Sequence, residues 1–155
     1  MAAKKQTPPG KEFINFARLQ DYIGYRARQA QSAIFRDFTG ITDAVGLSPG
    51  EFSLLTLIGA NPGINQVTLV SLHNLDKSTL SLAIRDLKRR NLIESRRQTE
   101  DGRYFALYLT KLGSQRQRQA TALVEGQERR MDKMLKPGER EILLDLLKRI
   151  SKAFD

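Results

Sequence analysis

The sequence contains no cysteine and no tryptophan, and it has one histidine, His73. Without cysteine the chain can form neither a disulfide nor a thiolate nucleophile, and a Cys/His zinc site is excluded. No HExxH, GxSxG or glycine-rich phosphate loop occurs in the 155 residues, and His73 lies in a turn-like HNLD segment that favours a surface role over that of a general base. The sequence therefore predicts a protein that is not an enzyme and that needs no cofactor or metal.

Long apolar runs are also absent. No stretch of about 18 apolar residues could span a bilayer, and no charged-then-apolar leader opens the chain, so we expect a cytoplasmic protein without a membrane partner. Acidic residues are the minority, since 17 Asp and Glu stand against 26 Lys and Arg and leave a formal charge of +9. A chain this basic attracts polyanions, and double-stranded DNA is the favoured partner.

The positions of proline and the spacing of apolar residues divide the chain into an N-terminal tail and a helical domain. Residues 1–11 are small, basic and proline-containing, which predicts a disordered tail. Residues 12–155 are expected to form one mainly α-helical domain. Apolar residues at spacings of three or four predict a long helix from Phe13 to Val45, another from Thr110 to about Met134, and a last helix that starts near Pro137.

The middle of the chain carries a sequence of short helical signals. SPGE at 48–51 is a capping box that should start a helix. A short helix is expected at 65–72 with Val67 and Val70 pointing inward, followed by a tight turn and a longer basic helix at 76–90. Short helix, turn and basic helix together are typical of a helix-turn-helix, so we expect the basic helix to be the recognition helix.

The predicted recognition helix has two different faces. At roughly 100° per residue, Leu80, Ile84 and Leu87 fall on one face, and Asp76 is placed to cap its start. Short hydroxyls and arginines suit base edges and phosphates in a major groove, although an ordinary solvated face explains this helix equally well when it is considered alone. The candidate DNA contacts are Lys77, Ser78, Thr79, Ser81, Leu82, Arg85 and Arg89.

Two strand-like runs, LIESRRQ and YFALYL, flank a turn signal at Asp101-Gly102 and predict a β-hairpin wing. Arg96, Arg97 and Arg103 lie on its arms and tip, where they could reach phosphates or the minor groove. The alternative is a solvated hairpin edge that its charge protects from aggregation. The fold class is thus mainly α with a small β-hairpin wing, a winged helix-turn-helix lobe.

The predicted helices outside this lobe have more apolar surface than the chain can cover. The last helix alone places Ile142, Leu143, Leu146, Leu147 and Ile150 in one dense seam. We therefore expect a DNA-binding lobe at 47–109 and dimerisation helices at 12–46 and 110–155. A two-fold homodimer would set two recognition helices about one DNA turn apart on a pseudo-palindrome.

Three segments carry a family resemblance: LSPGEFSLLTLI, VTLVSLHNLDKSTLSLAIRDLKRRNLIESR and EDGRYFALYLTKLG. Its strongest marks are Leu75 to Thr79, the Asp-x-Arg of Asp101 and Arg103, and the Leu-Thr-x-x-Gly that ends at Gly113. Over nearly its whole length the chain resembles the MarR family of bacterial transcriptional regulators. The resemblance implies a homodimer of winged helix-turn-helix lobes, with Arg103 in the minor groove and Asp101 bracing the wing through neighbouring arginines.

The segment YRARQAQSAIFRDF is similar to regulators of aromatic-acid degradation that respond to aromatic acyl-CoA thioesters. This similarity implies a small-molecule effector, an aromatic acid or aromatic acyl-CoA, with Tyr22, Arg26 and Phe38 as candidate pocket residues. Equally, Tyr22 and Phe38 could belong to a dimer core and Arg26 to the solvated surface. The sequence thus predicts a ligand-responsive repressor. The alternative is a winged-helix protein-interaction module without specific DNA binding.

Overall fold

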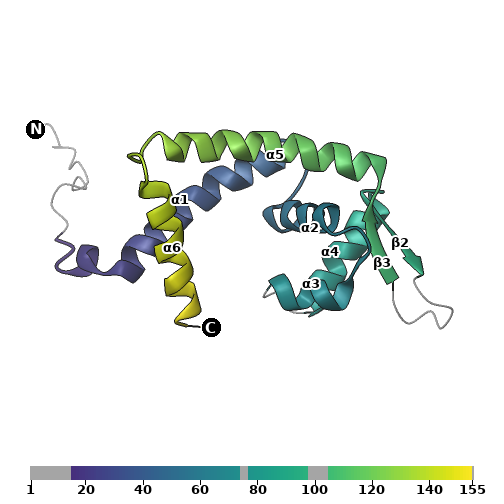
Figure 1. Cartoon of the computed structure of the whole chain (residues 1–155), viewed down its shortest axis with the longest axis horizontal. Helices are drawn as coiled ribbons and strands as arrows, with labels where there is room; N and C mark the ends of the chain where they lie inside the picture. Colours follow the sequence, from purple (N-terminus) through teal and green to yellow (C-terminus); the bar gives the residue numbers. More distant parts are fainter. Residues whose placement is uncertain (1–14, 74–76, 98–104, 155) are drawn as a thin grey trace, which may run out of the picture. The chain divides into compact units, whose positions relative to one another are not determined.

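The computed structural model describes residues 15–73, 77–97 and 105–154, which belong to two compact units that divide between Arg36 and Asp37. The chain is mostly helical with one small antiparallel sheet, which confirms the predicted fold class (Figure 1). No helix within these described ranges is long and apolar enough to cross a membrane. In chain order the elements are η2 (Leu19–Asp21), α1 (Ile23–Asp43), α2 (Pro49–Ala60), β1 (Ile64–Asn65), α3 (Gln66–His73), α4 (Lys77–Arg89), β2 (Ile93–Arg97), β3 (Phe105–Leu109), α5 (Lys111–Asp132) and α6 (Glu139–Lys152).

The first unit contains the short 3-10 helix η2 and most of α1. The sequence predicted a helix from Phe13 to Val45, but among the described residues the long helix begins only at Ile23. Ala17 has a left-handed backbone with φ 48°, and Tyr22 is extended with φ −82° and ψ 128°, so the chain is interrupted twice before the helix starts. Periodic apolar residues therefore extended the predicted helix too far toward the N-terminus.

Helix α2 starts at the predicted capping box. The Ser48 hydroxyl accepts a hydrogen bond from the Glu51 backbone N–H at 3.3 Å, and the Ser48 backbone N–H donates to Glu51 Oε2 at 2.7 Å. Pro49 occupies the first helical position, where its missing N–H has no intrahelical partner to lose. The start of the lobe is therefore fixed by local sequence.

The sheet has three strands in the order β1-β3-β2, all antiparallel. β2 and β3 are the predicted arms of the wing and pair from Ile93 opposite Leu109 to Arg97 opposite Phe105. The Asp101-Gly102 turn lies outside the described residues. Strand β1 was not predicted; its two residues pair with Leu107 and Ala106 of β3 and attach the start of α3 to the sheet.

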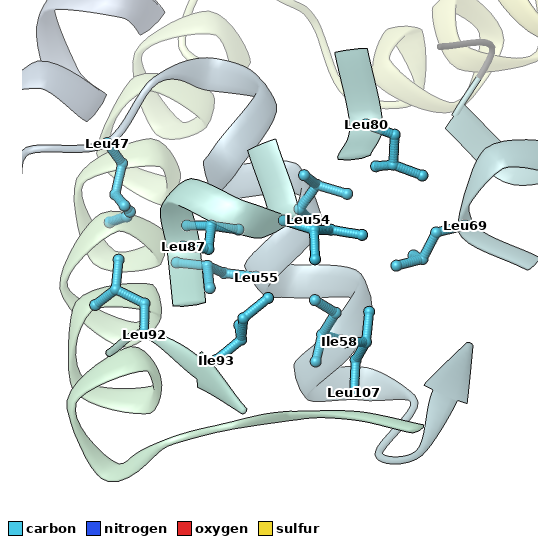
Figure 2. Packing of buried hydrophobic residues seen from close by; sticks show 12 residues of the cluster. Leu47, Leu54, Leu55, Ile58, Leu69, Leu80, Leu87, Leu92, Ile93 and Leu107 are labelled. Carbon is cyan, nitrogen blue, oxygen red and sulfur yellow. The ribbon is translucent and has the colours of Figure 1, made fainter. Parts of the chain in front are cut away.

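One apolar core joins α2, α3, α4 and the two wing strands (Figure 2). Leu80 and Leu87 of α4 are completely buried, as the two-faced pattern predicted. The prediction that Val67 points inward was wrong, because that side chain is 70% exposed and Leu69 enters the core from α3 instead. The leucines and isoleucine of this core with no exposed surface at all are Leu54, Leu55, Ile58, Leu69, Leu80 and Leu87.

Helix α5 begins in close contact with the wing. Thr110 caps it, because its hydroxyl accepts a hydrogen bond from the Gly113 N–H at 2.9 Å and donates to the Asn91 carbonyl at 2.6 Å. The Thr110 N–H donates to the Leu92 carbonyl at 3.1 Å. A Cβ at Gly113 would lie 1.8 Å from that same carbonyl oxygen, so only glycine fits this position.

Helix α6 leaves its apolar seam uncovered in the single chain. The half-exposed or exposed apolar side chains of the seam are Ile142, Leu143, Leu144, Leu146, Leu147 and Ile150. Arg140, on the first turn of α6, forms ion pairs with Glu128 at 3.0 Å and with Asp132 of α5. Ion pairs therefore stabilise the corner between α5 and α6, while the apolar seam of α6 stays exposed to solvent in the single chain.

Candidate nucleic-acid interface

Helix α4, the predicted recognition helix, separates its apolar and polar side chains as predicted. Leu80, Ile84 and Leu87 face the core, and the hydrophobic effect of burying them holds the helix on the lobe. Leu82 is 60% exposed although it is apolar. Of the side chains that the structure describes on this helix, the other exposed ones are Ser78, Thr79, Arg85, Lys88 and Arg89. Lys77 is the first residue of α4.

A cationic patch lies on the outward face of α4. Leu82, Arg85, Asp86 and Arg89 line a shallow depression on this surface. Asp86 forms ion pairs with Arg89 and, at 3.2 Å, with Arg90. Hydrogen bonds from Arg90 and Arg89 hold the pKa of the Asp86 carboxyl below its usual value. The carboxylate therefore stays charged near neutral pH, where it pairs with both Arg89 and Arg90.

Ser81 lies at the edge of this face instead of its centre. It is half-buried, and its hydroxyl accepts a hydrogen bond from Gln66 Nε2 of α3 at 2.6 Å. The sequence predicted Ser81 on the outward face beside Ser78, and Gln66 was not singled out. No signal within α3 or α4 alone could have found this bond, because its partners are 15 residues apart and meet only when the two helices pack.

The described arginines of the wing have different environments. Arg96 forms an ion pair with Glu94 at 2.6 Å, and its guanidinium lies 4.5 Å from the centre of the Tyr108 ring. These contacts hold it along the hairpin and brace the wing. Arg97 is exposed at the end of β2. The predicted residues Asp101 and Arg103 lie outside the described part of the chain.

Arg90 was not among the site residues predicted from the sequence. It donates to Glu51 Oε1 of α2 at 2.7 Å, to Asp86, and to the backbone carbonyl of Gly46 in the segment between α1 and α2. Glu51 uses its other oxygen in the capping box with Ser48, so one carboxylate joins the start of α2 to the end of α4. The capping box identified Glu51, but nothing local indicated a partner 39 residues away.

The candidate effector residues belong to different units. Tyr22 is 54% exposed in the first unit. Arg26 is held there by Gln20, through its backbone carbonyl at 2.8 Å and its side-chain oxygen at 3.2 Å. Phe38 belongs to the second unit, where its ring packs edge-to-face on Phe52 with 5.7 Å between centroids. Phe38 thus packs within its own chain, whereas the sequence suggested either an effector pocket or a dimer core for it.

The comparison with known proteins settles the family. The family model described as "MarR family" matches residues 47–105, the segment from the last residue before the capping box to the start of β3. The chain is also 31% identical over 129 residues to a Thauera aromatica protein whose name connects it with transcriptional regulation of the hcr operon, an alignment that spans 83% of this chain and 78% of that protein. This chain belongs to the MarR family. The resemblance seen in the sequence is confirmed, and the protein is a transcriptional regulator of the MarR type.

Solved structures of relatives have the same fold. The transcriptional repressor CouR bound to a 23-mer DNA duplex is 30% identical, with a TM-score of 0.83 over 89% of this chain and 98% of CouR. CouR bound to p-coumaroyl-CoA is 29% identical, with a TM-score of 0.76 over 89% of this chain and 97% of CouR. Both structures are of a protein described as a transcriptional repressor.

Proposed function

We propose that this MarR-type regulator is a cytoplasmic homodimeric repressor that binds a pseudo-palindromic operator and is released by an aromatic acid or its CoA thioester. The observation that carries the DNA-binding part is the outward face of α4, where Arg85 and Arg89 stand beside the exposed Leu82. Arginine can donate two hydrogen bonds to guanine, and leucine can contact a thymine methyl. CouR, which is similar along almost all of its length, was solved with duplex DNA.

The wing supplies phosphate contacts in this proposal. Arg97 is exposed at the end of β2, and the family resemblance assigns Arg103 to the minor groove and Asp101 to bracing. Arginine contacts to phosphates give most of the affinity and little of the sequence preference. The remaining candidates, Lys77, Ser78, Thr79 and Ser81, would adjust position along the groove.

The dimer follows from the uncovered seam of α6. Six apolar side chains of this helix are half-exposed or exposed in one chain, and water contact with such a continuous surface is unfavourable. A second copy of the chain would bury it. Two-fold symmetry would then present two α4 helices to successive major grooves on one side of the duplex.

The proposed effector class is taken from the similar protein CouR. CouR was solved with p-coumaroyl-CoA, a thioester of an aromatic acid. Tyr22 offers an exposed aromatic ring and Arg26 a cation for an acid or phosphate group, while Phe38 already packs on Phe52. A ligand could bind more tightly to a form of the dimer in which the distance between the two recognition helices does not match the DNA. Such a ligand must weaken DNA binding, because ligand binding and DNA binding are linked equilibria.

Two substitutions test the DNA-binding part. A pool of random duplexes, selected by binding to the wild-type protein and sequenced, first defines the operator. Arg103→Ala should then weaken binding to the operator and to all its single-base variants alike, whereas Arg85→Ala should also reduce the preference among those variants. If the protein enriches no sequence above its charge-driven binding, the protein-interaction module without specific DNA binding replaces this proposal.

The effector is tested by thermal shift and by operator competition. p-Coumaroyl-CoA, free p-coumarate and unesterified CoA are compared with the wild-type protein and with Arg26→Ala. We expect a ligand to raise the melting temperature and to release the operator, and Arg26→Ala to weaken both effects. If none of the three compounds changes either measurement, this class of effector is wrong, and Tyr22 and Phe38 are then better explained as dimer or core residues.

A further inference from the structure

Two polar contacts hold the recognition helix from opposite sides. Arg90 directly follows α4, and its N–H still donates to the Asp86 carbonyl at 3.0 Å, so it continues the helical path. Ser81 and Arg90 are nine residues apart, and at about 100° per residue this places them roughly 180° apart around the axis of α4. The buried line of Leu80, Ile84 and Leu87 runs between them. Each flank of the helix therefore has its own attachment, one in the middle of the helix and one at its C-terminal end.

The first attachment comes from α3. Gln66 Nε2 donates to Ser81 Oγ at 2.6 Å, and both residues are half-buried. Gln66 is itself fixed, because Leu69 anchors α3 in the core and Asn65 caps it with a 2.8 Å hydrogen bond from the Thr68 N–H. A short bond from a fixed donor leaves Ser81 little freedom to move sideways.

The second attachment comes from α2 and the segment before it. Arg90 donates to Glu51 Oε1 at 2.7 Å and to the Gly46 carbonyl, and Ser48 fixes the other oxygen of Glu51 at 2.7 Å. The Glu51 side chain is only 13% exposed, so water competes weakly for this carboxylate. The C-terminal end of α4 is thereby locked to an independently capped helix.

Apolar contacts alone do not fix rotation as tightly as these bonds do. Burial of leucine is non-directional, whereas a hydrogen bond weakens steeply when its angle changes. With side chains at about 5–6 Å from the helix axis, a rotation of 10° displaces them by about 1 Å. A displacement of that size is enough to misalign a bidentate contact between an arginine and a base.

We propose that Gln66 and Arg90 are positioning residues for sequence recognition, which set the rotation of α4 about its axis and so decide which side chains meet the base edges. This inference rests on the proposed function, because it assumes that α4 enters the major groove. It adds two residues outside the recognition face to the determinants of operator choice.

The test compares Gln66→Ala and Arg90→Ala with wild type on the selected operator, its single-base variants and a random duplex. Val67→Ala is the matched control, since Val67 is the next residue of α3 and its side chain is 70% exposed. We expect both positioning variants to lose about tenfold in the ratio of operator to variant affinity, with binding to the random duplex unchanged. Val67→Ala should keep the wild-type ratio.

If Gln66 and Arg90 only stabilised the fold, their replacement would lower the fraction of folded protein, which affects every duplex equally. The ratio of operator affinity to variant affinity would then be unchanged. Unchanged ratios in both variants, with a wild-type protein that does prefer the operator, would overturn this inference and leave the proposed function standing. A wild-type protein that prefers no duplex overturns both. If Arg90→Ala does not fold, Arg90→Lys takes its place. Lysine keeps the positive charge but lacks the branched guanidinium that binds Glu51 and Gly46 at the same time. We expect the same loss in the ratio of operator to variant affinity.

Discussion

Replacing Gly113 with alanine should strongly destabilise the fold, and the structure gives the reason in detail. The added Cβ would lie 1.8 Å from the Leu92 carbonyl oxygen and 2.8 Å from its carbonyl carbon. An ordinary carbon–oxygen contact is about 3.3 Å, so the first turn of α5 must move away from the end of the wing by roughly 1.5 Å. Both contacted atoms of Leu92 belong to its backbone, so no side-chain rotation can relieve the contact.

The size of the effect follows from what that movement breaks. The Thr110 N–H loses its 3.1 Å bond to the Leu92 carbonyl, which costs about 1 kcal/mol. The cap that Thr110 provides to the Gly113 N–H is strained or lost, at about 1 kcal/mol. Overpacking adds about 1–3 kcal/mol, while alanine in a helix returns about 1 kcal/mol. We expect a net loss of about 2–4 kcal/mol in unfolding free energy, which lowers the melting temperature by about 5–15 °C.

Gly126 in the same helix provides the control. The nearest atom to a Cβ at Gly126 is the mobile end of Arg129, at 3.8 Å, so alanine fits there without strain. Gly126→Ala should stabilise the protein by about 0.5–1 kcal/mol, because it removes flexibility from the unfolded chain. Urea or thermal unfolding of the two variants measures the difference. If Gly113→Ala unfolds at the same midpoint as Gly126→Ala, the close approach of α5 to the wing is wrong.

Three further predictions address capping, pH and salt. Ser48→Ala should lower the unfolding free energy by about 1 kcal/mol because α2 loses its cap, and an unchanged urea midpoint would refute the capping box. Asp86 has a pKa below its unfolded value of 3.8, so its contribution to stability is present above that pH and is lost as the pH falls through the folded value. Asp86→Asn should therefore be less stable than wild type near neutral pH and approach it in acid; a stability difference that stays constant with pH contradicts this. Arg97→Ala should reduce the slope of log affinity against log salt by about 0.9 on any duplex, whereas Arg129→Ala on α5 should not change it.

Local signals in the sequence predicted the elements that position the site. The capping box at Ser48 depends on side chains within three residues of the helix start, so it could be recognised before folding. Thr110 was predicted only as the start of a helix, and its capping hydrogen bond was not. The apolar face of α4 was also predictable, because three turns of helix repeat the pattern and leave Leu80 and Leu87 in the core.

The predictions from the sequence failed where a segment was too short for its pattern to be clear, or where the two partners of a contact were far apart in the sequence. Helix α3 has eight residues, and its apolar spacing does not distinguish Val67 from Leu69; the packing of the whole lobe decides that Leu69 is inside. Strand β1 has two residues and exists only because β3, more than forty residues later, pairs with it. The Gln66–Ser81 and Arg90–Glu51 bonds likewise join segments that meet only after folding.

The central claim is that the exposed face of α4 recognises a DNA sequence. The most direct measurement is the ratio of dissociation constants for the selected operator and for a scrambled duplex of equal length and composition, both at about 150 mM salt. We expect the operator to bind at least about 1,000-fold more tightly than the scrambled duplex. A ratio near one, with binding that disappears equally for both duplexes as salt is raised, would contradict it.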